Sequence, residues 1–233
     1  MKHLPNALTL LRLALAPVVV WLFWMGAVSP GELPPVVTGP EDLSAAKAFT
    51  QYFKTVAFNL TLAAAFFAVA ALTDLFDGMA ARAFNAHSKI GRLIDPIADK
   101  AIVDLPLIVI SIAMWRSGYP LWPVVATATA VIVLRDVSMT LIRLTSPDGE
   151  GARVSSLAKI KTALELIVVG SLLSVSAIGA HLQVQHSIDN PGYVLVPFYA
   201  LAFEWGWLIT LVVTAALSAW TAFQYLRPAK PAH

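Results

Sequence analysis

The chain contains several runs of apolar residues, each close to the length that a membrane-spanning helix requires. Such a helix needs about 20 predominantly apolar residues to cross about 30 Å of hydrocarbon. We place six spans, at 7–26, 55–80, 95–115, 120–144, 157–180 and 196–226. The 233 residues are 58% hydrophobic and only 13% charged, which is more apolar side chain than a soluble domain of this length can bury. We therefore predict one domain over residues 1–233, an all-α polytopic integral membrane protein with about six transmembrane helices.

Lysine and arginine residues are concentrated on one side of these spans. The connections on the other side contain only Lys47, Lys54 and Arg116. By the positive-inside rule, both termini and the connection between the second and third spans face the cytoplasm. We expect the protein to lie in the cytoplasmic (inner) membrane. The basic residues cluster at cytoplasmic span ends, so we expect membrane lipids and no nucleic acid as partners. The residues on the basic side are Lys2, Arg12, Arg82, Lys89, Arg92, Lys100, Arg135, Arg143, Arg153, Lys159, Lys161, Arg227 and Lys230.

The longest connection, residues 26–53, is predicted to lie outside. Its second part, from Glu41 to Phe53, follows Gly39-Pro40 and predicts a helix that runs into the second span. We interpret this connection as a spacer. The chain contains no cysteine, which excludes disulfides and thiolate metal sites.

Four aspartates lie close together between apolar segments: Asp74, Asp77, Asp95 and Asp99. The first two are three residues apart and the last two are four apart, so on helices each pair shares one face. If the two helices face each other, four carboxylates converge, and only cations make such a group tolerable. Hard oxygen ligands suit Mg²⁺ or Mn²⁺. We therefore expect a divalent-cation site, with two ions, rather than a solvated face paired with nearby basic residues.

The same segment contains eight fixed positions of a longer pattern, D-x2-D-G-x2-A-R-x8-G-x3-D-x3-D: Asp74, Asp77, Gly78, Ala81, Arg82, Gly91, Asp95 and Asp99. This pattern resembles the signature of the CDP-alcohol phosphotransferases. The resemblance implies that the four aspartates bind the metal and that Asp99 is also the catalytic base for an alcohol. It further implies that the CDP group is bound by Asp74, Gly78, Ala81, Arg82 and Gly91. Taken without the resemblance, Gly78 and Ala81 would indicate only close helix packing in lipid.

Three other segments resemble bacterial phosphatidylglycerophosphate synthases: residues 4–12, the pattern Arg135-Asp136-x6-Arg143, and residues 156–162. This chain differs from the usual residues of those synthases at three positions. Asp136 stands where Glu is more usual, Ala158 where Gly is frequent, and Glu165 where Gln is more usual. This resemblance implies CDP-diacylglycerol as donor and glycerol 3-phosphate as acceptor, and we expect a homodimer. The acceptor phosphate would be bound by Arg135, Arg143, Lys159 and Lys161. The alternative is that these cations bind lipid headgroups.

Two rival functions remain open. A cardiolipin synthase of the same superfamily would use phosphatidylglycerol as acceptor, and a cation transporter would also carry intramembrane acids. A transporter is less favoured because the four aspartates flank one cytoplasmic connection instead of lying at mid-span. Two further residues receive structural interpretations: Asp104 is expected to pair with Lys100 one turn away, and Arg12 to anchor the first span at the membrane interface.

Overall fold

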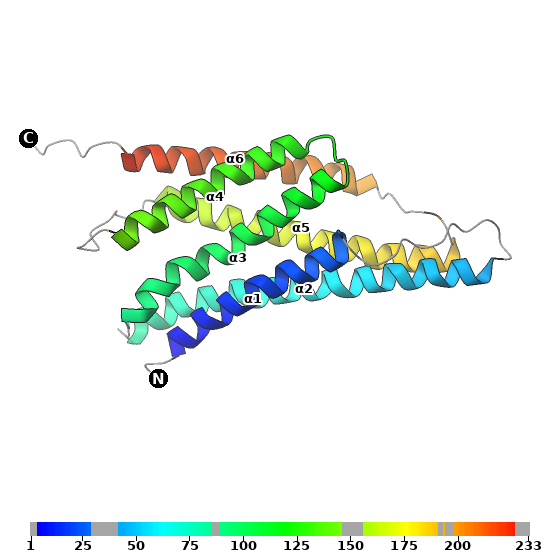
Figure 1. The fold of residues 1–233 in the computed structure, drawn as a ribbon, viewed down its shortest axis with the longest axis horizontal. Helices are drawn as coiled ribbons and strands as arrows, with labels where there is room; N and C mark the ends of the chain where they lie inside the picture. The colour runs from blue at the N-terminus through cyan, green and yellow to red at the C-terminus, as the bar shows by residue number, and fades with distance from the viewer. Residues whose placement is uncertain are drawn as a thin grey trace, which may run out of the picture.

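The computed structural model describes a bundle of long α-helices (Figure 1). It describes the backbone of residues 4–28, 42–84, 89–145, 156–190, 193 and 198–226, and the side chains of residues 7–28, 42–73, 94, 97–142, 157, 159–190, 193 and 203–225. Within these ranges the chain forms six helices and no β-strand. They are α1 (Leu4–Ala27), α2 (Leu43–Phe84), α3 (Lys89–Arg116), α4 (Trp122–Thr145), α5 (Ser156–Asp189) and α6 (Phe198–Leu226).

The six helices run side by side along the long axis of the molecule (Figure 1). Helix α1 packs against α2 and α3, α2 packs against α5, α3 packs against α4, and α6 packs against α4 and α5. The start of α1 and the end of α6 lie at the same end of the bundle, together with the facing ends of α2 and α3 and of α4 and α5. This end therefore carries the four-aspartate segment, and we call it the motif end.

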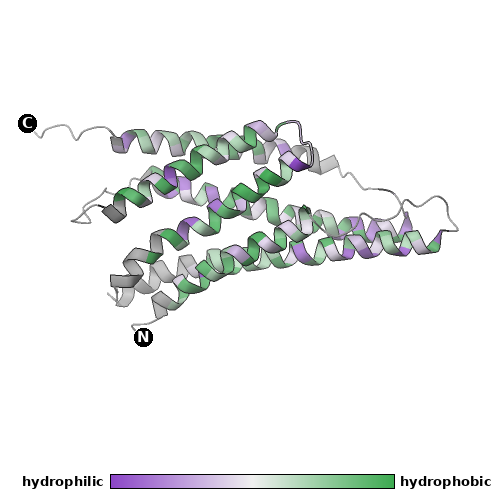
Figure 2. Cartoon of the chain, in the orientation of Figure 1, coloured by the Kyte–Doolittle hydropathy of each residue, from purple (hydrophilic) through white to green (hydrophobic). Residues whose placement is uncertain are grey.

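Among the residues whose side chains are described, five of the six helices contain a segment long and apolar enough to cross a membrane: Ala7–Ala27, Leu43–Thr73, Trp122–Ile142, Lys159–Asp189 and Phe203–Tyr225. Hydrophobic residues dominate these helices in Figure 2. Helix α3 falls outside this group because charged residues, including Asp99, Lys100 and Asp104, interrupt its apolar sequence. The predicted all-α polytopic membrane protein is confirmed, and the predicted span at 95–115 corresponds to a helix whose charges require partners inside the bundle.

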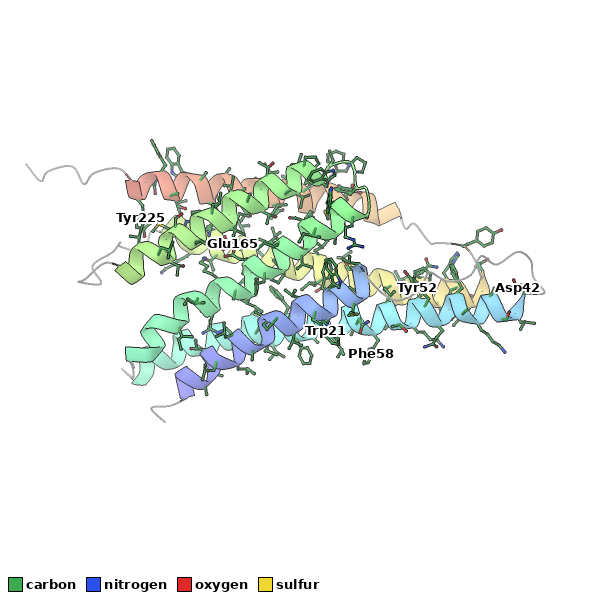
Figure 3. All side chains as sticks on the ribbon, viewed as in Figure 1. Trp21, Asp42, Tyr52, Phe58, Glu165 and Tyr225 are labelled. Atoms are coloured by element: carbon green, nitrogen blue, oxygen red, sulfur yellow. The ribbon has the colours of Figure 1, made fainter. Side chains whose placement is uncertain are left out.

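Small residues allow the helices to approach closely. Ala16, Ala63 and Ala70 are fully buried between helices. A Cβ atom at Gly26 of α1 would lie 2.8 Å from Leu60 Cγ of α2, so glycine at this position permits the close α1–α2 contact. Large apolar side chains such as Trp21 and Phe58 lie on the outer surface (Figure 3). This arrangement fits a bundle whose surroundings are lipid.

Helices α2 and α5 extend beyond the others at the end opposite the motif (Figure 1). With 42 residues, α2 is about 63 Å long at 1.5 Å per residue, which exceeds the thickness of a bilayer core. Asp42 caps its start by accepting a hydrogen bond from the Ala45 N–H at 3.2 Å. The helix predicted from Glu41 to Phe53 is thus present, beginning at Leu43. Thr50 Oγ1 donates to the Ser187 carbonyl at 3.4 Å and ties the two extensions together.

The last turn of α3 is held in place at the end of the bundle opposite the motif end. Gly118 adopts a positive φ of 70°, and the Gly118 and Tyr119 N–H groups donate to the Trp115 and Met114 carbonyls, which is the Schellman arrangement. The Arg116 guanidinium lies 5.5 Å from the centre of the Trp24 ring of α1. Helices α1 and α3 are therefore joined by a cation at this end.

Candidate active site

The aspartates of the motif lie at the facing ends of two consecutive helices. Asp74 and Asp77 belong to the last turns of α2, and Asp95 and Asp99 to the first turns of α3. As expected, each pair lies within one helix. The side chains of Asp74, Asp77, Gly78, Ala81, Arg82, Gly91 and Asp95 lie outside the described residues. Among the residues that are described, no group of three potential ligands forms a metal site.

Asp99 is the one motif residue whose side chain is described, and it forms an ion pair with Arg12 of α1. The Arg12 side chain is 2% exposed, whereas that of Asp99 is 44% exposed. Arg12 therefore turns into the helix bundle instead of toward lipid headgroups, and its expected role as an anchor at the membrane interface stays a prediction. A guanidinium buried in an apolar bundle requires a partner of opposite charge, and Asp99 is that partner.

On another side of α3, five charged residues of three helices form a buried cluster, which we call the ion cluster. Its anions are Asp136 of α4 and Glu165 of α5, both with fully buried side chains. Figure 3 labels Glu165 in the interior of the bundle. The cluster consists of Lys100, Arg135, Asp136, Lys161 and Glu165.

Lys161 is the centre of this cluster. Its Nζ atom lies 2.5 Å from Asp136 Oδ1 and 2.5 Å from Glu165 Oε1. Lys100 Nζ lies 2.7 Å from Asp136 Oδ2 and 3.6 Å from Glu165 Oε2, and Arg135 Nη1 donates to Asp136 Oδ1 at 2.8 Å. Each charge therefore faces at least one opposite charge, which offsets the cost of burial.

The four cations predicted to bind the acceptor phosphate occupy different environments. Arg135 and Lys161 meet at Asp136, whereas Lys159 is exposed. Lys159 and Lys161 are two residues apart, so their side chains point about 200° apart around α5. The side chain of Arg143 lies outside the described residues. The buried Nε of Arg135 has no hydrogen-bond partner among the residues described, so this guanidinium retains a donor for an anion.

Asp104 does not pair with Lys100 in the way predicted. Lys100 turns toward Asp136 and Glu165 instead, because two fully buried carboxylates offer more stabilisation than one acid on its own helix. Asp104 Oδ1 is buried without a hydrogen-bond partner among the described residues. It lines a groove of about 380 Å³ between α3 and α4, together with Lys100, Asp136 and apolar side chains.

Comparison with known proteins agrees with this arrangement. The family model for CDP-alcohol phosphatidyltransferase matches residues 2–189, which include all four aspartates and the whole ion cluster. The chain belongs to this family. No solved structure matches the chain.

Several similar proteins are named CDP-diacylglycerol–glycerol-3-phosphate 3-phosphatidyltransferase. One from Bacillus subtilis (strain 168) is 31% identical over 174 residues, covering 74% of this chain and 77% of the relative. One from Escherichia coli (strain K12) is 25% identical and covers 98% of this chain and 95% of the relative. One from Cereibacter sphaeroides is 28% identical and covers 98% of this chain and 96% of the relative. The matches cover 77–96% of the length of these relatives.

As a member of the CDP-alcohol phosphatidyltransferase family, the chain is an enzyme. The predicted donor set of four carboxylates, carried by two consecutive helices, would suit a hard divalent cation, and its one described member, Asp99, has an accessible side chain at the motif end. Arg12 is the functional candidate that the sequence interpretation missed. A signal was present, since an arginine inside an apolar run of a membrane helix is expensive and usually has a partner.

The ion cluster leads to a prediction about stability. Replacing Lys161 by alanine leaves the buried carboxylates of Asp136 and Glu165 without their central cation, which typically destabilises a protein by about 3–5 kcal/mol. Heating the purified Lys161→Ala protein in detergent should therefore melt its helices at a clearly lower temperature than the wild type, as followed by circular dichroism. The exposed Lys159→Ala is the matched control and should change stability by less than about 0.5 kcal/mol. Equal melting temperatures for the two variants would contradict the buried network.

Proposed function

We propose that this protein transfers the phosphatidyl group of CDP-diacylglycerol to glycerol 3-phosphate, releasing CMP and forming phosphatidylglycerophosphate, in phospholipid biosynthesis. The observation that carries the proposal is similarity, over 74–98% of the chain, to phosphatidyltransferases whose names specify these two substrates. The arrangement at the motif end supports it, because an accessible carboxylate and a group of cations lie on adjoining helices.

The reaction that we propose is a displacement at phosphorus. Asp99 accepts the proton of the glycerol 3-phosphate hydroxyl, and that oxygen forms a bond to the β-phosphorus of CDP-diacylglycerol. The bond from this phosphorus to the CMP oxygen breaks, and CMP leaves. Asp99 suits the role of base because its side chain is exposed at the motif end and accessible to a substrate.

We propose that Mg²⁺ or Mn²⁺ is held by Asp74, Asp77, Asp95 and Asp99. When bound, such ions neutralise charge on the diphosphate and on the leaving phosphate. Asp74, Gly78, Ala81, Arg82 and Gly91 would bind the CDP group. Gly78 and Ala81 provide the small side chains that a ligand needs for close approach, and Arg82 provides a planar guanidinium for phosphate.

Metal removal tests this proposal directly. In detergent, the purified protein should release CMP from CDP-diacylglycerol when glycerol 3-phosphate is present, and a chelator should abolish the release. Adding Mg²⁺ or Mn²⁺ back should restore it, because clustered carboxylates cannot organise a diphosphate alone. The lipid product should be phosphatidylglycerophosphate. Turnover that survives complete metal removal would refute the metal site, and cardiolipin formed from phosphatidylglycerol would refute the acceptor.

The acceptor phosphate is proposed to bind Arg135, Arg143, Lys159 and Lys161. Two observations support a contribution from Arg135 and Lys159. The buried Nε of Arg135 has no hydrogen-bond partner in the described part of the chain, and Lys159 is exposed near the motif end. Lys161 already contacts two carboxylates, so it would act mainly by holding Asp136 against Arg135.

Lys159 provides a test of this pocket that leaves the ion cluster intact. Losing one charge-assisted hydrogen bond costs about 1.5–3 kcal/mol, which corresponds to a loss of affinity of about ten- to a hundredfold. Lys159→Ala should therefore raise the KM for glycerol 3-phosphate about tenfold or more while leaving the KM for CDP-diacylglycerol nearly unchanged. Lys47→Ala, an exposed lysine at the opposite end of the bundle, is the control. Equal KM values in both variants would show that Lys159 does not bind the acceptor.

We propose that the protein lies in the cytoplasmic membrane with both termini and the active site facing the cytoplasm. The Lys and Arg distribution supports this orientation. The alignment of α3 with the other five helices supports six crossings and hence termini on one side (Figure 1). The predicted homodimer remains a prediction, which the molar mass of the detergent-solubilised protein would test.

Single cysteines in this cysteine-free chain would test the orientation. Cysteine in place of Ser44, an exposed residue at the start of α2, should react with a membrane-impermeant thiol reagent on intact cells. Cysteine in place of His87, between α2 and α3, should react only after the cells are opened. The reverse pattern would put the active site outside.

A further inference from the structure

Arg12 is the one charged residue of α1 (Leu4–Ala27) and contacts the residue proposed to act as base. Its side chain is almost completely enclosed, and its ion-pair partner is Asp99 of α3. Thr9, one turn earlier on α1, is buried as well. A buried guanidinium is expensive in an apolar bundle, and many apolar residues could join α1 to α3 at a lower cost. The position of this arginine therefore calls for a role beyond helix packing.

The difference in exposure between the two partners indicates what that role is. Arg12 is 2% exposed and Asp99 is 44% exposed, so the arginine contacts the carboxylate from the interior and the carboxylate faces outward. A guanidinium is planar and binds a carboxylate in a restricted orientation, whereas an ammonium acts as a point charge. Arg12 thus restricts the rotation of the Asp99 side chain from its buried side.

We infer that Arg12 is a positioning residue for catalysis, holding the Asp99 carboxylate in the orientation in which it accepts the proton of the acceptor alcohol. The inference rests on the proposed function, because it requires Asp99 to be the base. Arg12 acts through Asp99 and does not contact the substrates. Its replacement should therefore lower kcat and leave the KM values for both substrates nearly unchanged.

The test compares Arg12 with a cation that joins the same two helices at their other end. Arg12→Ala and Arg12→Lys are assayed for CMP release in detergent with saturating Mg²⁺, CDP-diacylglycerol and glycerol 3-phosphate. A catalytic group displaced by about 1 Å can lose on the order of a hundredfold in rate, so we expect kcat to fall by about ten- to a hundredfold in Arg12→Ala and less in Arg12→Lys. Arg116→Ala removes the cation beside Trp24 and should retain the wild-type kcat.

A double-mutant cycle separates positioning from folding. In an Asp99→Asn background, Arg12→Lys should cause no further loss of kcat, because the carboxylate on which it acts is absent. Thermal unfolding of the same four metal-free proteins gives a second measure, in which the pair should again be non-additive. Since Arg12→Lys keeps the charge, it serves as the test variant if Arg12→Ala does not fold.

The outcomes distinguish this inference from the proposed function. A wild-type protein without CMP release would overturn both. With an active wild type, a wild-type kcat in Arg12→Lys, a selective rise in KM, or additive losses in the Asp99→Asn background would overturn the positioning role and leave the phosphatidyl transfer in place. A fall in kcat that Arg12→Lys causes in the wild-type background but not in the Asp99→Asn background would establish the positioning role of Arg12.

Discussion

The structure depends on how buried charges find partners inside an apolar helix bundle. Helix α3 carries adjacent charges that point in different directions: Asp99 contacts Arg12 of α1, and Lys100 contacts Asp136 of α4 and Glu165 of α5. In a low-dielectric interior, an unpaired ion costs several kcal/mol. These contacts therefore fix the rotation of α3 relative to three neighbouring helices, and the contact with Arg12 fixes the orientation of Asp99. The pairing of buried charges therefore bears both on the stability of the bundle and on the proposed chemistry.

The same constraint explains why this fold can include a helix that is too charged to count as a membrane span by its composition. Two charges of α3 are paired by its neighbours, Asp99 by α1 and Lys100 by α4 and α5. Apolar side chains such as Ile97, Leu105 and Ile108 remain exposed on its outer side. At the opposite end, the Arg116 contact with Trp24 and the turn at Gly118 hold α3. The helix is thus held at both ends, and the contacts with α1, α4 and α5 at the motif end are the ones that lie beside Asp99.

The proposed acceptor pocket adjoins a cluster whose charges nearly balance. Within the ion cluster, three cations face two anions, and Asp104 lies nearby in the adjoining groove. The positive groups left near the motif end are the exposed Lys159 and the Nε of Arg135, which has no hydrogen-bond partner among the described residues. We propose that a small dianion such as glycerol 3-phosphate binds there, and that Lys161 and Glu165 hold the other members of the cluster in place.

The helices and the family could be predicted from the sequence, because both depend on local patterns of residues. Apolar runs predicted the six helices, and the resemblance of the pattern from Asp74 to Asp99 to the signature of the CDP-alcohol phosphotransferases predicted the family. The partners of individual charges could not be predicted, since they depend on which faces of distant helices meet. Arg12 and Asp99 are 87 residues apart, and Lys159 and Lys161 look equivalent in sequence although one is exposed and the other buried. Only the packing of the helices decided these partners, because an ion in an apolar interior pairs with whichever opposite charge the tertiary structure places beside it.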